Sequence, residues 1–268
     1  MAARPIGMFD SGFGGLTVAR ALIDLMPNED LVYIGDTGRY PYGSKPAAEV
    51  REYAREIAWS LVRDFDVKAI VVACNTASAV AFEALRQEIP VPVLEVINPG
   101  ARSLVQATRN KNVGVIGTVG TVSSGAYVRA VADTGADVML TSAACPGFVE
   151  FVERGQTTGD EVMVLAERLL APVRAANVDA LLLGCTHYPY LARVISEVMG
   201  PNVVLVSSAD ETAFAVRDEL IREEMVSGSG PGKHTFLSSG DVAWFAELGG
   251  KLLGPELNDA KLWTPNGS

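Results

Sequence analysis

The feature that most constrains this chain is the alternation of short apolar runs with longer amphipathic segments. The apolar runs are continuous rather than alternating, which indicates strands buried on both faces. They predict strands at Ile6–Phe9, Leu31–Ile34, Ala69–Ala73, Val91–Val96, Val113–Ile116, Val138–Thr141, Ala180–Leu183 and Val203–Val206. The amphipathic segments predict helices at Leu16–Leu25, Pro46–Phe65, Ala77–Glu88, Arg102–Thr108, Gly125–Asp133, Asp160–Ala176 and Glu211–Met225. Repeated β-α-β order with short connections predicts an α/β fold with largely parallel sheets flanked by helices.

An internal repeat divides this pattern into two similar halves. Val67–Thr76 matches Val178–His187, and in both copies a buried strand ends at a cysteine, Cys74 or Cys185. The offset, 185 − 74 = 111 residues, is the size of one domain. A weaker similarity relates residues 6–11 to residues 113–118 at nearly the same spacing. We therefore expect two pseudo-symmetric domains with a cleft between them; the alternative is a chance likeness of two buried strands.

The boundaries of the two domains follow less directly from the sequence. We expect the first domain to comprise residues 1–97 plus 208–268, and the second to comprise residues 98–207. The active site is expected in the cleft between them. Ser227–Gly232 has the composition of a connector, and the tail beyond Leu253 is expected to be irregular.

Composition excludes several classes of function. The 22 basic and 32 acidic residues give a net charge of −10, which disfavours nucleic-acid binding and a polybasic membrane anchor. No apolar run is long enough for a membrane span, and the first residues lack the pattern of a signal peptide. Three widely spaced cysteines fit free thiols in the reducing cytoplasm, and two histidines without a CxxC spacing make a zinc site improbable.

Cys74 and Cys185 are the residues most able to carry chemistry. Each ends a predicted strand, where open α/β sheets bind ligands, and each precedes small polar residues. A following helix start is expected to lower the pKa of each thiol. Two thiols on opposite faces of one carbon could remove a proton from one side and deliver one to the other, which is racemisation. A disulfide, a metal site and two buried core thiols remain alternatives.

Asp10 and His187 are candidates for supporting these thiols. Asp10 follows the first predicted strand and precedes a glycine-rich turn, and His187 lies two residues after Cys185. A helix cap and a histidine satisfied at a helix start are the purely structural alternatives. Two further loops follow strands and could bind carboxylates through backbone amides: residues 40–46 and residues 117–121. Cys145 has no duplicated partner and is expected to be a buried core thiol.

Five segments together resemble the cofactor-independent aspartate/glutamate racemase family. They are Phe9–Val18, Tyr33–Lys45, Ala73–Ser78, Val113–Thr121 and Gly184–Pro189, so the resemblance extends over most of the chain. It implies two pseudo-symmetric α/β domains and the interconversion of L- and D-glutamate without a cofactor or metal. In bacteria this reaction supplies D-glutamate for peptidoglycan and hence for the cell wall.

The resemblance also implies roles for individual residues. Cys74 would deprotonate the D-isomer and Cys185 the L-isomer, with Asp10 assisting Cys74 and His187 assisting Cys185. Glu153 matches a family glutamate near the second thiol. The residues that would hold the substrate are Asp10, Ser11, Tyr42, Gly43, Asn75, Thr76, Thr186 and His187, with Thr118 and Thr121 as further candidates. Gly147, Glu150 and Tyr190 depart from the residues usual in the family.

Two other functions remain open at this point. An aspartate racemase would share the two-thiol chemistry, and a two-lobed amino-acid-binding protein would share the lobes and the carboxylate-binding loops. Binding alone gives no reason for paired thiols, which favours an enzyme. We expect a small-molecule substrate, no nucleic-acid or membrane partner, and a homodimer.

Overall fold

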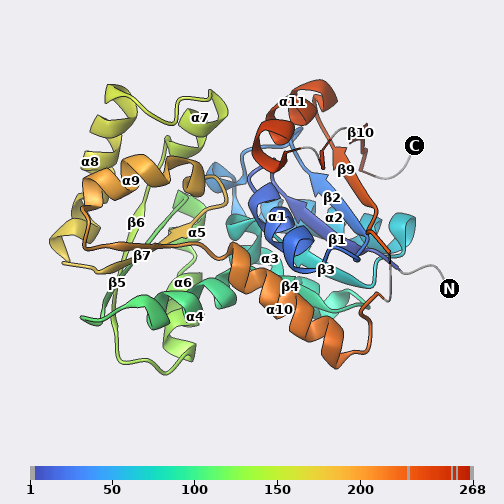
Figure 1. Cartoon of the computed structure of the whole chain (residues 1–268), viewed down its shortest axis with the longest axis horizontal. Helices are drawn as coiled ribbons and strands as arrows, with labels where there is room; N and C mark the ends of the chain where they lie inside the picture. The colour runs from blue at the N-terminus through green and yellow to red at the C-terminus, as the bar shows by residue number, and fades with distance from the viewer. Residues whose placement is uncertain (1–3, 228–229, 255, 258, 266–268) are drawn as a thin grey trace.

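The strands of the protein form two sheets, and every described strand pairing is parallel (Figure 1). The structure is a computed structural model that describes residues 4–227, 230–254, 256–257 and 259–265. The larger sheet has the order β10-β9-β2-β1-β3-β4 and the smaller one the order β6-β5-β7-β8. The strands are β1 (Ile6–Asp10), β2 (Leu31–Gly35), β3 (Ala69–Val72), β4 (Val93–Glu95), β5 (Asn112–Gly117), β6 (Met139–Ala144), β7 (Ala180–Gly184), β8 (Val204–Val206), β9 (His234–Ser238) and β10 (Lys261–Leu262).

Helices cover both sheets. They are α1 (Leu16–Leu25), α2 (Ala47–Phe65), α3 (Asn75–Glu88), α4 (Ile97–Ala107), α5 (Val119–Ser123), α6 (Ala126–Asp133), α7 (Phe148–Glu153), α8 (Asp160–Ala175), α9 (Ala192–Met199), α10 (Ala209–Arg222) and α11 (Val242–Leu253), with short 3₁₀ helices η1 (Tyr42–Ser44) and η2 (Tyr188–Leu191). None of the helices in the described residues combines the length and apolar character of a membrane span. We call the larger sheet with its helices the first lobe and the smaller sheet with its helices the second lobe.

The strand order repeats between the lobes and confirms the predicted fold class. The order β2-β1-β3-β4 in the first lobe corresponds to β6-β5-β7-β8 in the second. Strands β3 and β7 therefore occupy equivalent positions, which explains why the cysteines that follow them recur at the same point of each half. Because the carboxyl ends of parallel strands share one edge of a sheet, both cysteines lie where open α/β sheets bind ligands.

The apolar strands are buried between helical layers. In β1, Met8 packs in a cluster with α1, α10 and α11, whereas Phe9 packs in a separate cluster with α2 and α3. In the second lobe, Val115 and Leu182 pack with α4 and α6, and Leu181 faces α8 and α9. Burial on both faces accounts for the continuous apolar runs in the sequence.

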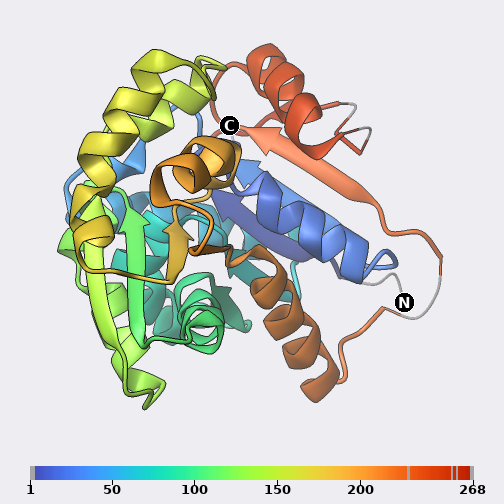
Figure 2. The same ribbon diagram turned by 60° about the vertical axis from the view of Figure 1, so that its left-hand side comes forward.

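The C-terminal region returns to the first lobe, where β9 pairs with β2 (Figure 2). The sequence did not predict β9 or α11, and the expectation of an irregular tail is wrong at Lys261–Leu262, which pairs with β9. Helix α4 begins at Ile97 rather than Arg102, because the Glu95 carboxylate accepts the backbone amides of Ile97 and Asn98 and so caps the helix. Residues 228–229 of the predicted connector lie outside the described residues, and the domain boundaries at 97/98 and 207/208 stay a prediction.

Candidate active site

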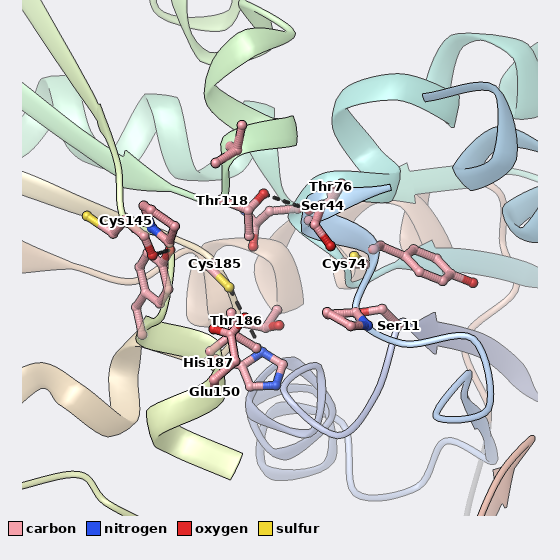
Figure 3. Close-up of a pocket in the computed structure, with 18 of the residues that line it drawn as sticks. Ser11, Ser44, Cys74, Thr76, Thr118, Cys145, Glu150, Cys185, Thr186 and His187 are labelled. Atoms are coloured by element: carbon pink, nitrogen blue, oxygen red, sulfur yellow. Dashed lines mark hydrogen bonds between the residues drawn. The ribbon is translucent and has the colours of Figure 1, made fainter. Parts of the chain in front are cut away.

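One pocket is lined by loops from the carboxyl ends of strands in both lobes (Figure 3). Its cavity volume is about 80 Å³. The first lobe contributes Ser11, Tyr40, Pro41, Tyr42, Gly43, Ser44, Cys74, Asn75 and Thr76, and the second contributes Thr118, Val119, Cys145, Pro146, Gly147, Val149, Glu150, Cys185, Thr186, His187 and Tyr188. The pocket thus brings together both matched cysteines and most of the substrate-holding residues expected from the sequence.

Cys74 occupies the N-cap position of α3, directly after β3. Its sulfur accepts a hydrogen bond from the backbone amide of Ala77 at 3.5 Å. Burial, and to a smaller extent the charge of Asp10, raise the pKa of the Cys74 thiol to about 12, although hydrogen bonds from Ala77 and Ser11 act in the opposite direction. The expected lowering by the helix start is therefore present but outweighed by burial.

Cys185 follows β7 and lies on the opposite side of the pocket from Cys74 (Figure 3). Its sulfur is 3.9 Å from Nδ1 of His187, and Nε2 of the same ring is 3.3 Å from Oε1 of Glu153. Burial raises the pKa of Cys185 well above its ordinary value, with smaller contributions from Cys74 and Asp10. Glu153 does not line the pocket; it stands behind His187 and can fix the position and tautomer of that ring.

Asp10 is fully buried at the end of β1 and lies behind the pocket wall rather than in it. Its carboxylate accepts the backbone amide of Gly12 at 3.1 Å and the hydroxyl of Thr186 at 3.5 Å. The same carboxylate raises the pKa of both Cys74 and Cys185. Asp10 therefore acts on both thiols, whereas the sequence placed it beside Cys74 alone.

Tyr42 and Gly43 belong to the loop that includes η1. The Tyr42 hydroxyl donates to the buried carboxylate of Asp36, which also accepts the hydroxyl of Ser239 at 2.6 Å. The Tyr42 hydroxyl is thus engaged with Asp36 instead of facing a substrate. A Cβ added at Gly43 would lie 2.7 Å from the Cβ of Thr118, so glycine permits this loop to touch the second lobe.

Hydroxyl groups join the two lobes at the pocket. The Oγ1 atom of Thr76 lies 3.0 Å from that of Thr118 and 3.3 Å from that of Thr121, and the last two are 3.0 Å apart. Thr121 completes this triangle without lining the pocket. The Asn75 amide donates to the Tyr127 hydroxyl at 2.7 Å, and its Oδ1 has no partner among the described residues. Hydroxyl groups therefore gather where the lobes meet, and Asn75 keeps one unpaired amide oxygen among the described residues.

Tyr40, Ser44, Cys145 and Glu150 are among the lining residues that were not expected individually as site residues. Tyr40 and Ser44 flank the Tyr42 loop, and Glu150 stands on the first turn of α7. Cys145 is buried, as expected, but it also borders the pocket, and burial raises its pKa to about 12. The strand end at Ala144 was the signal that could have located Cys145. The described residues contain no cluster of His, Cys, Asp and Glu side chains suited to a metal ion.

This arrangement suits proton transfer at a carbon held between the lobes. The two thiols face the pocket from different lobes and both are protonated near neutral pH, so each can donate a proton and, once ionised, accept one. No lysine or arginine of the described residues lines the pocket. A ligand carboxylate would therefore be held by hydroxyls and backbone amides.

Comparisons of the sequence and of the structure with known proteins point to the same family. Residues 17–216 match the model of the Asp/Glu/hydantoin racemase family. A glutamate racemase of Parafrankia sp. is 52% identical over 262 residues, covering 96% of this chain and 93% of that protein. A glutamate racemase structure from Bacillus anthracis aligns with a TM-score of 0.91 at 37% identity, covering 97% of this chain and 96% of that one. One from Francisella tularensis in complex with D-glutamate has a TM-score of 0.91 at 31% identity, covering 99% of both chains.

Proposed function

The chain belongs to the Asp/Glu/hydantoin racemase family, and from this premise we propose that it interconverts L- and D-glutamate by proton transfer between two thiols. The observation that carries the proposal is the pair of buried cysteines that follow equivalent strands and face one pocket from different lobes. Near-full-length similarity to glutamate racemases supports glutamate as the substrate.

In the L-to-D direction, Cys185 removes the proton from Cα and Cys74 delivers one to the opposite face. Cys185 must first lose its own proton, and Nδ1 of His187 is positioned to take it. This requires His187 to carry its neutral-state proton on Nε2, which the Glu153 carboxylate at 3.3 Å favours. In the D-to-L direction, Cys74 is the base: its thiol must first lose a proton, for which the Asp10 carboxylate is the proposed acceptor, and the raised pKa makes the resulting thiolate a strong base for the proton of Cα.

The substrate itself must lower the barrier to ionising the thiols. Glutamate carries two carboxylates and one ammonium, and the ammonium is the positive charge that the lining residues lack. The proposed acceptor for this ammonium is Oδ1 of Asn75, a buried atom that has no partner among the described residues. For the carboxylates we propose the hydroxyls of four lining residues and the backbone amide of Gly43; the four are Ser11, Thr76, Thr118 and Thr186. Closure of the lobes around the ligand would exclude water and strengthen these interactions.

Deuterium incorporation tests this function directly. In deuterated water, the wild-type protein should convert L-glutamate to D-glutamate that carries deuterium at Cα, and aspartate should react much more slowly. Cys74→Ser and Cys185→Ser should each abolish racemisation while binding glutamate. Near-normal turnover by either variant would refute the two-thiol mechanism, and binding of glutamate without deuterium incorporation would indicate a binding protein instead.

We also propose a cellular setting for this reaction. D-glutamate produced in the cytoplasm would enter peptidoglycan synthesis and so support the cell wall. Three free and buried thiols fit a reducing compartment. A homodimer is expected from the frequency of such assemblies, and light scattering of the purified protein would test it.

A further inference from the structure

Tyr40 lies at the junction of the two lobes without a role in the mechanism so far. It follows β2 in the first lobe and lines the pocket. Its ring centroid is 6.1 Å from that of His187 in the second lobe, with an interplanar angle of 32°. Tyr40 is thus one of two first-lobe rings beside the imidazole expected to take the proton of Cys185; the other, Phe13, lies 5.0 Å from it between ring centroids and carries no hydroxyl.

The polar atoms around Tyr40 are buried but incompletely paired. The Tyr40 hydroxyl, Oε1 of Glu153 and Nε2 of His187 are all buried, and none makes a well-directed hydrogen bond within the described residues. Burial is the main cause that raises the pKa of Tyr40 well above its ordinary value, and the nearby Glu153 adds to it, first through a poorly directed hydrogen-bond contact with the hydroxyl and then through its charge. Glu150 and Cys185 contribute to the same effect from the second lobe.

Unpaired buried polar groups that face one another favour a small movement that pairs them. Leaving such a donor or acceptor unsatisfied is costly, so a conformation that joins the hydroxyl to the carboxylate is favoured. Catalytic hydrogen bonds are often loose in a ligand-free enzyme and tighten when the substrate is bound. Since Tyr40 and Glu153 belong to different lobes, closure of the lobes is the movement that brings them together.

We propose that Tyr40 is a positioning residue for the Cys185 side of the reaction: on closure its hydroxyl donates to Glu153 and holds that carboxylate against Nε2 of His187. With Nε2–H directed at Glu153, the lone pair of Nδ1 faces the Cys185 sulfur. The inference rests on the proposed function. It makes proton acceptance by His187 depend on closure of the lobes.

The test compares primary isotope effects in the two directions. The equilibrium constant of a racemase is one, so Tyr40→Phe must lower kcat/KM equally in both directions, by about tenfold for one lost hydrogen bond. The isotope effects need not change equally. With Cα-deuterated L-glutamate, whose deuteron Cys185 removes, the effect on kcat/KM should rise. With Cα-deuterated D-glutamate, whose deuteron Cys74 removes, it should fall.

Two further variants separate this role from a general loss of structure. Glu153→Gln should shift the isotope effects in the same sense, and the double variant Tyr40→Phe/Glu153→Gln should be no slower than Glu153→Gln alone, because both changes remove one interaction. Tyr53→Phe is the control, since its hydroxyl binds only the exposed Glu49 at 3.2 Å, and it should behave as wild type.

The outcomes distinguish a failure of the inference about Tyr40 from a failure of the proposed function. If the wild-type protein racemises glutamate and Tyr40→Phe leaves both isotope effects unchanged, the inference is wrong while the proposed function stands. Additive losses in the double variant would also overturn it. If the wild-type protein does not racemise glutamate, the proposed function is wrong and the inference falls with it.

Discussion

Alkylation of Cys74 should report a thiol that stays protonated far above neutral pH. Burial and the charge of Asp10 raise its pKa to about 12 from an ordinary value of 9.0. At pH 8 such a thiol is ionised in about one molecule in ten thousand, against about one in ten for an ordinary thiol. The thiolate of the higher pKa is intrinsically more nucleophilic, by roughly twentyfold over three pKa units. The thousandfold smaller ionised fraction therefore slows alkylation by about fiftyfold overall.

The pH dependence is a sharper readout than the absolute rate, because access to a buried thiol also slows alkylation. We expect the iodoacetamide reaction at Cys74, followed by mass spectrometry of the tryptic peptides, to rise about tenfold per pH unit from pH 8 to pH 10 without a plateau. Bound D-glutamate should protect Cys74. A plateau below pH 10 would refute the argument that burial dominates this pKa.

Asp10→Asn tests the second cause of the raised pKa. Removing the neighbouring carboxylate charge should move the alkylation curve of Cys74 to lower pH, by about one unit. Asp24→Asn is the matched control, because that side chain is exposed on α1 and its substitution should leave the curve in place. An unchanged curve in Asp10→Asn would show that its charge does not act on Cys74.

Two further predictions concern the contact between the lobes and the support of the first lobe. Gly43→Ala should lower kcat/KM for glutamate at least tenfold with little change in stability, because the added Cβ would lie 2.7 Å from that of Thr118. Steady-state kinetics and thermal unfolding measure the two effects, and wild-type kinetics in this variant would contradict the prediction. Lys68→Met should reduce the free energy of unfolding by about 3–5 kcal/mol, because it leaves Glu29 buried without its partner. Urea denaturation measures this loss, and Lys111→Met, which breaks an exposed pair with Asp137, should cost less than about 1 kcal/mol.

The sequence predicted strands from continuous apolar runs, including the partly buried β6 and β8, and missed β9, which begins with polar residues. All eight predicted strands exist, because runs such as Ala69–Val72 are apolar on both faces. Strand β9 is only partly apolar, with His234 and Thr235 half-buried, and it follows a glycine-rich segment. Its pairing with β2 is a contact between residues far apart in the chain, which local pattern does not reveal.

The sequence located those candidate site residues that directly follow strands. It missed side chains that reach the pocket only through contact between the lobes. Cys74, Cys185 and the polar residues after them were located by the repeat, and the pocket includes them. Tyr40 was included only as part of the loop of residues 40–46, because the proximity of its side chain to His187 exists only once the lobes are packed together. The thiol pKa was predicted in the wrong direction, since helix starts are visible in a sequence and the degree of burial is not.

The position of the two sulfurs around a bound substrate can be measured in a crystal structure with D-glutamate. Cα should lie between them, with Sγ of Cys74 and Sγ of Cys185 each within about 4 Å of it on opposite faces. Either sulfur remote from Cα, or both sulfurs on the same face, would contradict the two-thiol mechanism.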